Sequence, residues 1–331
     1  MTSSLPLGDD RLEEEVLAEL DDVERRLVEA AENANPLVRT PARHLMDAGG
    51  KRLRPVLVML TSHFGSGIND EVRTAAVATE LTHLATLYHD DVMDDAPLRR
   101  GAPSAQQLWG NSVAILVGDL LFAKASQMVS TLGPTAVRIQ AEAFERLVLG
   151  QLHETLGPGD GEDPVAHYID VLADKTGSLI AAAANYGTLF SGADEASARA
   201  SIAYGEKVGV AFQLADDVID LVSDAETLGK EPGTDLRAGV VTMPVLLLRA
   251  RAAAGTLDDV GASILADLAS DDETVRASTL GRLRHHEVLD EARMLAHRWA
   301  TDAVAELDIL PDSATKRALI AFADLVVDRL S

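Results

Sequence analysis

The sequence predicts an all-α protein, because its composition and its hydrophobic periodicity both favour helices. Apolar residues make up 47% of the 331-residue chain but aromatic residues only 4%, so Ala, Leu and Val carry most of the apolar mass. That composition favours helices over β-sandwiches. Near the N-terminus apolar residues recur at three- and four-residue spacing, as in Leu12, Val16, Leu20, Val23 and Leu27, which is the period of an amphipathic helix. We therefore expect few strands or none.

Short breaks separate the predicted helices. Helical periodicity begins near residue 10, so residues 1–9 are predicted to be a flexible tail. After the tail, breakers rich in Gly, Pro or Asn divide about a dozen helical stretches. They lie at 35–36, 49–50, 65–67, 96–97, 133–134, 157–159, 192 and 229–233. Because no linker or fixed-period repeat interrupts this pattern, residues 10–331 are predicted to form one domain.

The charge balance limits the classes of partner. The chain carries 53 acidic and 29 basic residues, a net charge of −24. Such a molecule repels nucleic acid and anionic lipid, so an anionic ligand needs a local basic cluster. The absence of Cys excludes disulfides and thiolate catalysis and fits a reducing compartment, so we expect a cytoplasmic protein. We also expect neither a signal peptide nor a membrane span.

The strongest chemical signal is an acidic cluster at the end of an apolar helical stretch. Asp90, Asp91 and Asp94 are spaced i, i+1, i+4, so their carboxylates share one helical face. Pro97 limits the helix, which places these acids near its negative C-terminal end. A divalent cation would relieve both the mutual repulsion and the unfavourable dipole, and oxygen ligands suit Mg²⁺ or Mn²⁺.

A second acidic cluster repeats the first. A single run of this kind is more often a solvated helix end, but Asp216, Asp217 and Asp220 have the same spacing and also end an apolar stretch. Two such clusters on different helices can face each other across a cavity and hold several hard cations. A diphosphate would complete the coordination of those cations. The recurrence therefore predicts a metal-dependent diphosphate site.

Basic residues are scarce overall but concentrate near the acidic clusters. Each of them alone would be a solvated surface cation. Together they form four groups, most of them beside glycine, where a backbone can approach a phosphate closely. The groups contain Lys51, Arg52 and Arg54 after a Gly-Gly turn, Arg99 and Arg100 after the first cluster, Lys175, and Lys230.

In this combination the residues resemble the trans-polyprenyl diphosphate synthases, over about Gly49 to Pro244. The resemblance implies a single large helical bundle of the isoprenoid synthase type around a deep central cavity. It implies sequential condensation of an allylic diphosphate with isopentenyl diphosphate to an all-trans polyprenyl diphosphate. About three Mg²⁺ ions per site, replaceable by Mn²⁺, would assist the reaction. It also implies a homodimer.

The resemblance assigns roles to individual positions. For isopentenyl diphosphate it implies Lys51, Arg54, His83 and Arg100. For the allylic diphosphate it implies Arg99, Lys175, Thr176, Gln213 and Lys230, with Lys175 also counted as catalytic. For the metal ions it implies Asp90, Asp94 and Asp216, with Asp91, Asp217 and Asp220 completing the catalytic acids. One departure is Val240, which stands where many relatives carry Lys, although Lys230 and Arg237 remain.

Small residues below the first acidic cluster bear on the product. A growing prenyl tail would follow the face of the helix that precedes Asp90, and over about three turns, roughly 16 Å, no bulky side chain of that face blocks it. This chain-length face comprises Ala78, Thr79, Thr82, Ala85 and Thr86. It predicts a long-chain product of the range used for quinone side chains, with geranylgeranyl diphosphate as the shorter alternative.

Three other functions explain less of the sequence. A class I terpene cyclase shares the helical fold and the first acidic motif, but it needs neither a second Asp motif of this type nor an isopentenyl diphosphate site. A non-catalytic synthase subunit typically loses acids from these motifs, and both are complete here. An acidic scaffold or calcium-binding protein would leave the four ordered basic groups unexplained.

Overall fold

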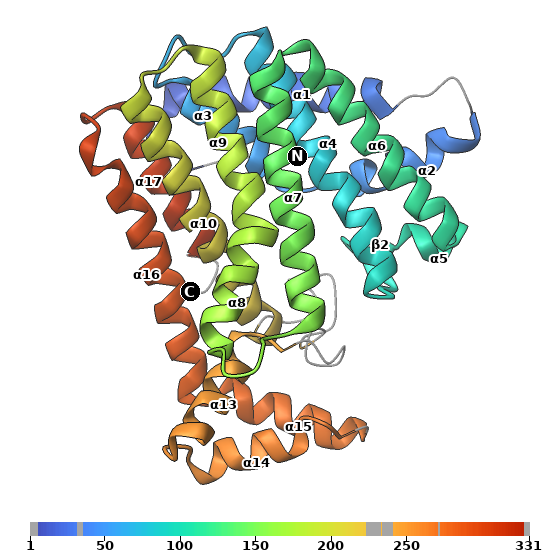
Figure 1. Ribbon diagram of the computed structural model, residues 1–331, viewed down its shortest axis with the longest axis vertical. Helices are drawn as coiled ribbons and strands as arrows, with labels where there is room; N and C mark the ends of the chain where they lie inside the picture. Colours follow the sequence, from blue (N-terminus) through green and yellow to red (C-terminus); the bar gives the residue numbers. More distant parts are fainter. Residues whose placement is uncertain (1–5, 32–35, 223–232, 234–240, 271, 328–331) are drawn as a thin grey trace.

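The structure is a computed structural model that describes residues 6–31, 36–222, 233, 241–270 and 272–327. Helices dominate these residues, which confirms the predicted all-α class (Figure 1). The first half contains α1 (Asp10–Ala31), α2 (Pro36–Asp47), α3 (Leu53–Ser62), α4 (Asp70–Met93), α5 (Ala105–Trp109), α6 (Asn111–Thr131) and α7 (Pro134–Leu156). Between α4 and α5 the chain forms an antiparallel hairpin of β1 (Leu98–Arg99) and β2 (Ala102–Pro103).

The second half continues the bundle and adds a group of short helices at one end. Its elements are α8 (Pro164–Leu172), the π-helical η1 (Ala173–Gly177), α9 (Ser178–Ser191), α10 (Glu195–Val222), α13 (Met243–Ala254), α14 (Asp259–Asp267), α15 (Glu273–Arg284), α16 (Glu287–Glu306), the 3₁₀ turn η2 (Leu307–Ile309) and α17 (Ala314–Val327). Figure 1 shows α13, α14 and α15 gathered at the lower end, beneath the long helices.

Antiparallel packing brings the predicted functional residues to one end of the bundle. At the far end, the Ser66 N–H donates to the Ser191 carbonyl at 2.8 Å, and the Asn69 side chain donates to the Phe190 carbonyl at 2.8 Å. Asn69 also caps α4 by accepting the Val72 N–H. From this end, where α3 and α9 finish, α4 and α10 both run back toward the opposite end, where their acidic clusters lie.

Two buried tyrosines tie the long helices to their neighbours. The Tyr88 hydroxyl donates to the Pro41 carbonyl at 2.5 Å and so links α4 to α2, away from the chain-length face. The Tyr204 hydroxyl donates to the Leu319 carbonyl at 2.6 Å and links α10 to α17. Because each hydroxyl is satisfied, burying these large side chains adds apolar contact without leaving a polar group unpaired.

The length and apolar composition of helix α6 must be weighed against the expectation that the chain has no membrane span. Among the described residues it alone is long and apolar enough to cross a membrane by length and composition, and 33% of its apolar stretch is buried. It packs along α4, where a Cβ at Gly118 would lie 2.4 Å from the His89 ring. A core helix of a soluble bundle passes the same test, so one such helix is weak support for a span.

Candidate active site

The first acidic cluster forms the last turn of α4, as predicted. Asp94 caps the helix, and its N–H donates to the Asp90 carbonyl at 2.8 Å. Burial raises the pKa of Asp90 to about 6, against the opposing charges of Lys175 and Arg99. Burial also raises the pKa of Asp94, although Lys175 opposes the shift. Full ionisation of both carboxyl groups is therefore unfavourable until a positive charge joins them.

Asp91, which lies between Asp90 and Asp94 in the sequence, is fully buried and binds an arginine of the following hairpin. Its Oδ1 accepts from Arg99 Nε at 2.6 Å, while its Oδ2 has no hydrogen-bond partner among the described residues. Burial raises the pKa of Asp91 and the Arg99 charge opposes that shift. This carboxylate therefore fixes Arg99 beside the first acidic cluster.

The β1–β2 hairpin directs two consecutive arginines to different groups. Its turn residues, Arg100 and Gly101, have φ angles of 54° and 77°, as a two-residue type I′ turn requires. Arg99 remains in β1 and pairs with Asp91. Arg100, at the tip, instead donates to the backbone carbonyls of Leu45, at 2.7 Å, and Gly49.

The Gly-Gly turn before α3 is shaped around Arg100. Gly50 has a φ of 152°, and a Cβ there would lie 2.9 Å from Arg100 Cζ. Only glycine fits this contact, because a side chain would displace the guanidinium. The sequence alone does not indicate this contact, because Gly50 and Arg100 are far apart in the chain and only folding brings them together.

Two of the predicted isopentenyl diphosphate residues, Arg54 and His83, lie close enough to Arg100 for its charge to act on them. Burial lowers the pKa of Arg54 to about 10, with Glu80 opposing and Arg100 adding to the shift. Burial, together with the charges of Arg54 and Arg100, lowers the pKa of His83 well below its ordinary value. His83 is therefore neutral at physiological pH and can offer one N–H as a donor, beside guanidinium groups that remain charged.

The π-helical segment η1 connects the two acidic clusters. Lys175 Nζ pairs with Glu154 Oε2 of α7 at 2.5 Å, and its charge opposes the rise in the pKa of Asp90 that burial causes. The next residue, Thr176, donates through Oγ1 to Gln213 Oε1 of α10 at 3.3 Å. Gln213 precedes Asp216 by three residues, or about one helical turn.

A close backbone contact sets this geometry. A Cβ at Gly209 would lie 2.7 Å from the Gly177 Cα, so α10 and η1 touch backbone to backbone. On the other side of η1, a Cβ at Gly150 of α7 would lie 2.7 Å from the Lys175 nitrogen. Glycines in helical positions thus allow α7 and α10 to close on η1 from two sides.

The second acidic cluster lies on the last turns of α10. Asp217 and Asp220 are buried and Asp216 is half-buried. Asp217 Oδ2 accepts from the Tyr168 hydroxyl at 2.8 Å and from the Met243 N–H at 3.1 Å. Asp217 therefore joins α8, α10 and the start of α13, as Asp91 joins α4 to the hairpin.

The donor set suits a hard divalent cation, although the described carboxylates do not come together as a group of three or more ligands. Among the described residues, no three or more His, Asp or Glu side chains are arranged to hold a metal ion. Both clusters offer oxygen atoms only, and burial, with a smaller contribution from the Asp94 charge, raises the pKa of Asp90. Oxygen ligands of this kind suit Mg²⁺. The assignment of Asp90, Asp94 and Asp216 as metal ligands stays a prediction.

Some residues of the site were not predicted from the sequence, and some predicted residues cannot be placed. Glu154 was missed, although the helical Gly150 four positions earlier signals a close backbone approach. Tyr168 was missed because nothing in its neighbourhood distinguishes it. The predictions for Lys230, Arg237 and Val240 lie outside the described residues.

Comparison with known proteins identifies the family. A family model described as polyprenyl synthetase matches residues 35–277. The chain is 42% identical to a nonaprenyl diphosphate synthase from Mycobacterium tuberculosis, covering 99% of this chain and 98% of the relative. A Caulobacter crescentus polyprenyl synthase structure, complexed with calcium and isoprenyl diphosphate, superposes with a TM-score of 0.86 at 33% identity, covering 97% and 98% of the two chains.

A second solved structure, a geranylgeranyl pyrophosphate synthase from Corynebacterium glutamicum complexed with the same ligands, gives a TM-score of 0.84 at 40% identity, covering 98% of each chain. The fold and its paired acidic clusters thus define a prenyltransferase of the isoprenoid synthase type. Within that class, the chain belongs to the polyprenyl synthetase family.

Proposed function

We propose that this protein condenses an allylic diphosphate with isopentenyl diphosphate, repeatedly, to a long-chain all-trans polyprenyl diphosphate of the range used for quinone side chains. The observation that carries the proposal is the division of the cations. Arg99 pairs with Asp91 and, with Lys175, acts on the first acidic cluster, whereas Arg100 turns to the Leu45 carbonyl and lies near Arg54. Two diphosphates with different tasks require two such groups.

The acidic clusters and the cations beside them would activate the allylic diphosphate. Mg²⁺ ions held by Asp90, Asp94 and Asp216 would supply positive charge to the allylic diphosphate as it leaves. Arg99, Lys175 and Thr176 would bind oxygens of that diphosphate and orient it. These interactions strengthen as the C–O bond breaks, so they stabilise the transition state more than the substrate.

The isopentenyl group would hold the second substrate in position to react. Lys51, Arg54 and Arg100 would bind its diphosphate, and neutral His83 would donate one hydrogen bond. Its double bond then attacks the allylic carbon as the C–O bond breaks, and the departing diphosphate accepts the proton that is lost. The apolar interior excludes water, which would otherwise capture the allylic cation.

Product length has two supports and one competing alternative. The small residues of the chain-length face and the similarity to a nonaprenyl diphosphate synthase both favour a long chain. The similarity to a geranylgeranyl pyrophosphate synthase keeps that shorter product as the second candidate.

We also propose a cytoplasmic homodimer that does not bind nucleic acid. The net charge of −24 disfavours polyanionic partners. The outer faces of α6 and α7 expose large apolar side chains that a second copy would cover. These are Ile115, Leu116, Val137, Val148, Leu149, Leu152 and Leu156.

Mass spectrometry of the products tests the reaction and its length together. Purified protein with Mg²⁺, farnesyl diphosphate and excess isopentenyl diphosphate should yield products longer than geranylgeranyl diphosphate, and chelation of the metal should abolish them. Products that stop at geranylgeranyl length would select the shorter alternative. Turnover of geranylgeranyl diphosphate without isopentenyl diphosphate would instead identify a cyclase.

A further inference from the structure

We propose that Arg52, Glu24 and Glu80 form a positioning network that holds the isopentenyl diphosphate site in its binding geometry. The inference rests on the proposed function and deepens it. Arg52 lies in sequence between Lys51 and Arg54, yet it is only 6% exposed. Its guanidinium is turned into the protein, so its part in the site must be indirect.

Arg52 binds three different helices. Its Nε and Nη2 hold both carboxylate oxygens of Glu24 on α1, with the Nη2–Oε2 distance at 3.1 Å. Its Nη1 donates to Glu80 Oε1 of α4 at 2.9 Å, and Nη2 also reaches the Met46 carbonyl of α2 at 3.3 Å. All three guanidinium nitrogens are therefore engaged within the protein. A planar fork of donors is required to make this set of contacts.

The backbone of Arg52 explains why an anchor is needed. Arg52 has φ 50° and ψ 34°, a left-handed conformation that is unfavourable for a residue with a Cβ. This single residue turns the chain from the Gly49–Gly50 bend into α3. Lys51 and Arg54 flank it, so any relaxation of Arg52 toward ordinary backbone angles would move both.

Glu80 supplies the negative charge that allows cations to gather here. It is 2% exposed, and its charge counters the loss of basicity that burial imposes on Arg54 and on Arg100. For Arg52, burial is outweighed by Glu24 and Glu80, which together raise its pKa above the ordinary value. Without this buried carboxylate, three guanidinium groups would repel one another before any diphosphate arrived.

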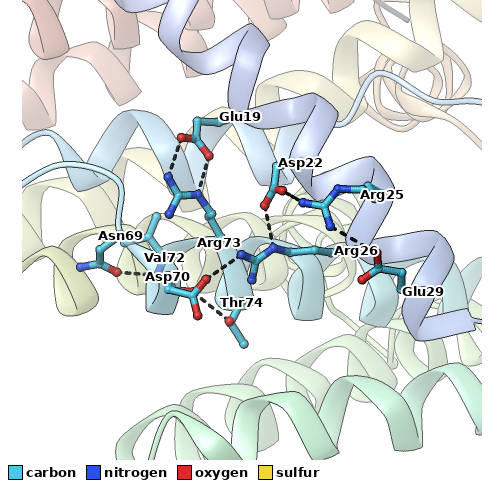
Figure 2. A network of polar contacts seen from close by, with 10 residues as sticks. All are labelled: Glu19, Asp22, Arg25, Arg26, Glu29, Asn69, Asp70, Val72, Arg73 and Thr74. Carbon is cyan, nitrogen blue, oxygen red and sulfur yellow. Dashed lines mark hydrogen bonds and ion pairs between the residues drawn. The ribbon is translucent and has the colours of Figure 1, made fainter.

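The network predicts that α1 contributes to substrate binding without touching the substrate. A second ion pair on α1 offers a matched control. Glu19 of α1 holds Arg73 of α4 through two bonds of 2.5 and 2.6 Å (Figure 2). This pair joins the same two helices, but Arg73 lies in the first turn of α4, at the end opposite the acidic cluster.

The experiment compares Glu24→Gln, Arg52→Asn and Arg52→Lys with the control Glu19→Gln. Asn tolerates the left-handed backbone, so Arg52→Asn removes the anchor and keeps the turn. Lys keeps the charge but lacks the fork. For each variant we would measure the thermal midpoint, the Kd of isopentenyl diphosphate by titration calorimetry, and the KM of both substrates.

We expect Arg52→Asn and Arg52→Lys to raise the Kd and KM of isopentenyl diphosphate about tenfold or more, because a displaced charged group loses most of its directed contacts. Glu24→Gln should raise both severalfold. The KM of the allylic diphosphate should change less than about twofold in each variant. Glu19→Gln should lower the thermal midpoint about as much as Glu24→Gln and leave both substrates' KM values unchanged.

Unchanged isopentenyl diphosphate binding in Glu24→Gln and Arg52→Asn would overturn the network. An equal rise in KM in Glu19→Gln would overturn it too, because the effect would then follow general stability. These failures differ from a failure of the proposed function. In that case the wild-type protein itself would neither bind nor consume isopentenyl diphosphate, and both inferences would fall together.

Discussion

Within each acidic cluster, burial divides aspartates that the sequence presents as equivalent. The middle residue of each cluster is almost fully buried and bonded to protein donors, Asp91 to Arg99 and Asp217 to Tyr168 and the Met243 N–H. The first residue of each cluster, Asp90 or Asp216, is only half-buried. The two positions therefore support different predictions, one about chemistry and one about stability.

Asp90→Ala and Asp216→Ala should each reduce turnover by orders of magnitude, because neither cluster alone can neutralise a departing diphosphate. Far-UV circular dichroism should stay unchanged, since both side chains are only half-buried. Steady-state assays at saturating Mg²⁺ measure the effect. Undiminished turnover in either variant would remove the metal-assisted mechanism.

Asp217→Ala should instead destabilise the fold, by about 2–4 kcal/mol, because the Tyr168 hydroxyl and the Met243 N–H would lose a buried acceptor. Asp217→Asn retains an acceptor oxygen and should cost less. Urea unfolding followed by circular dichroism gives the free energies. A loss in Asp217→Ala no larger than in Asp216→Ala would contradict the structural role.

These distinctions show what the sequence reveals at the scale of residues. The spacing of the aspartates identified both clusters, because i, i+1, i+4 spacing is a local property of a helix. The division of roles depends on Tyr168, 49 positions from Asp217, and on the burial that folding creates. The Arg52 network depends on Glu24 and Glu80, which lie 28 positions before and after Arg52, so no local sequence pattern predicts it.

At the scale of elements, the chain-length face shows a similar division. Ala78, Thr79, Thr82 and Ala85 are nearly fully buried, and none of them is bulky, as predicted. A side chain from another helix nevertheless reaches this face. Gln140 of α7 donates through Nε2 to Thr82 Oγ1 at 3.5 Å, across the interior between the two helices.

Gln140 lies at a depth where it can limit the tail. Thr82 precedes Asp90 by eight residues, which places it about 12 Å along the helix from the acidic cluster. Helices α4 and α7 each pack against α6 and α9, and the buried Gln140 side chain reaches from α7 to Thr82 of α4. Below it, the Tyr186 hydroxyl of α9 donates to the Ala136 carbonyl at 3.0 Å.

Substitutions at these two depths should move product length in opposite directions. Ala85→Phe should shorten the product without abolishing condensation, because the ring would fill the path near Asp90. Gln140→Ala should lengthen it, because the amide that crosses to Thr82 is removed. Mass spectrometry of products from farnesyl diphosphate and excess isopentenyl diphosphate measures both. An unchanged distribution in both variants would show that this face does not set the length.

The helices themselves were predictable because periodicity and breakers are local signals. Gly133 and Pro134 begin α7, and Gly157 and Gly192 end α7 and α9, as the breakers indicated. The hairpin and the π-helical η1 were not predicted. Two-residue strands leave no alternating pattern, and a π-helix is defined by bonds that the packing of α7 and α10 on η1 imposes.

At the scale of the molecule, α6, which among the described residues is apolar enough to span a membrane, also exposes a leucine beside the exposed leucines of α7. Leu116 of α6 is 65% exposed, and Leu152 and Leu156 of α7 are 49% and 80% exposed. Large apolar side chains gathered on neighbouring helices mark an interaction surface. A second copy related by two-fold symmetry would cover both faces at once.

The proposed homodimer makes a direct prediction. Sedimentation at micromolar concentration should show a species of twice the chain mass, and Leu152→Glu should convert it to monomer, because a buried unpaired charge at the interface is costly. Glu142→Gln, also exposed on α7 but polar in both forms, is the control and should leave the mass unchanged. A wild-type protein found only as monomer would reject the dimer. Recovery of the wild type with the membrane fraction, reversed by Leu152→Glu, would instead assign this apolar surface to lipid.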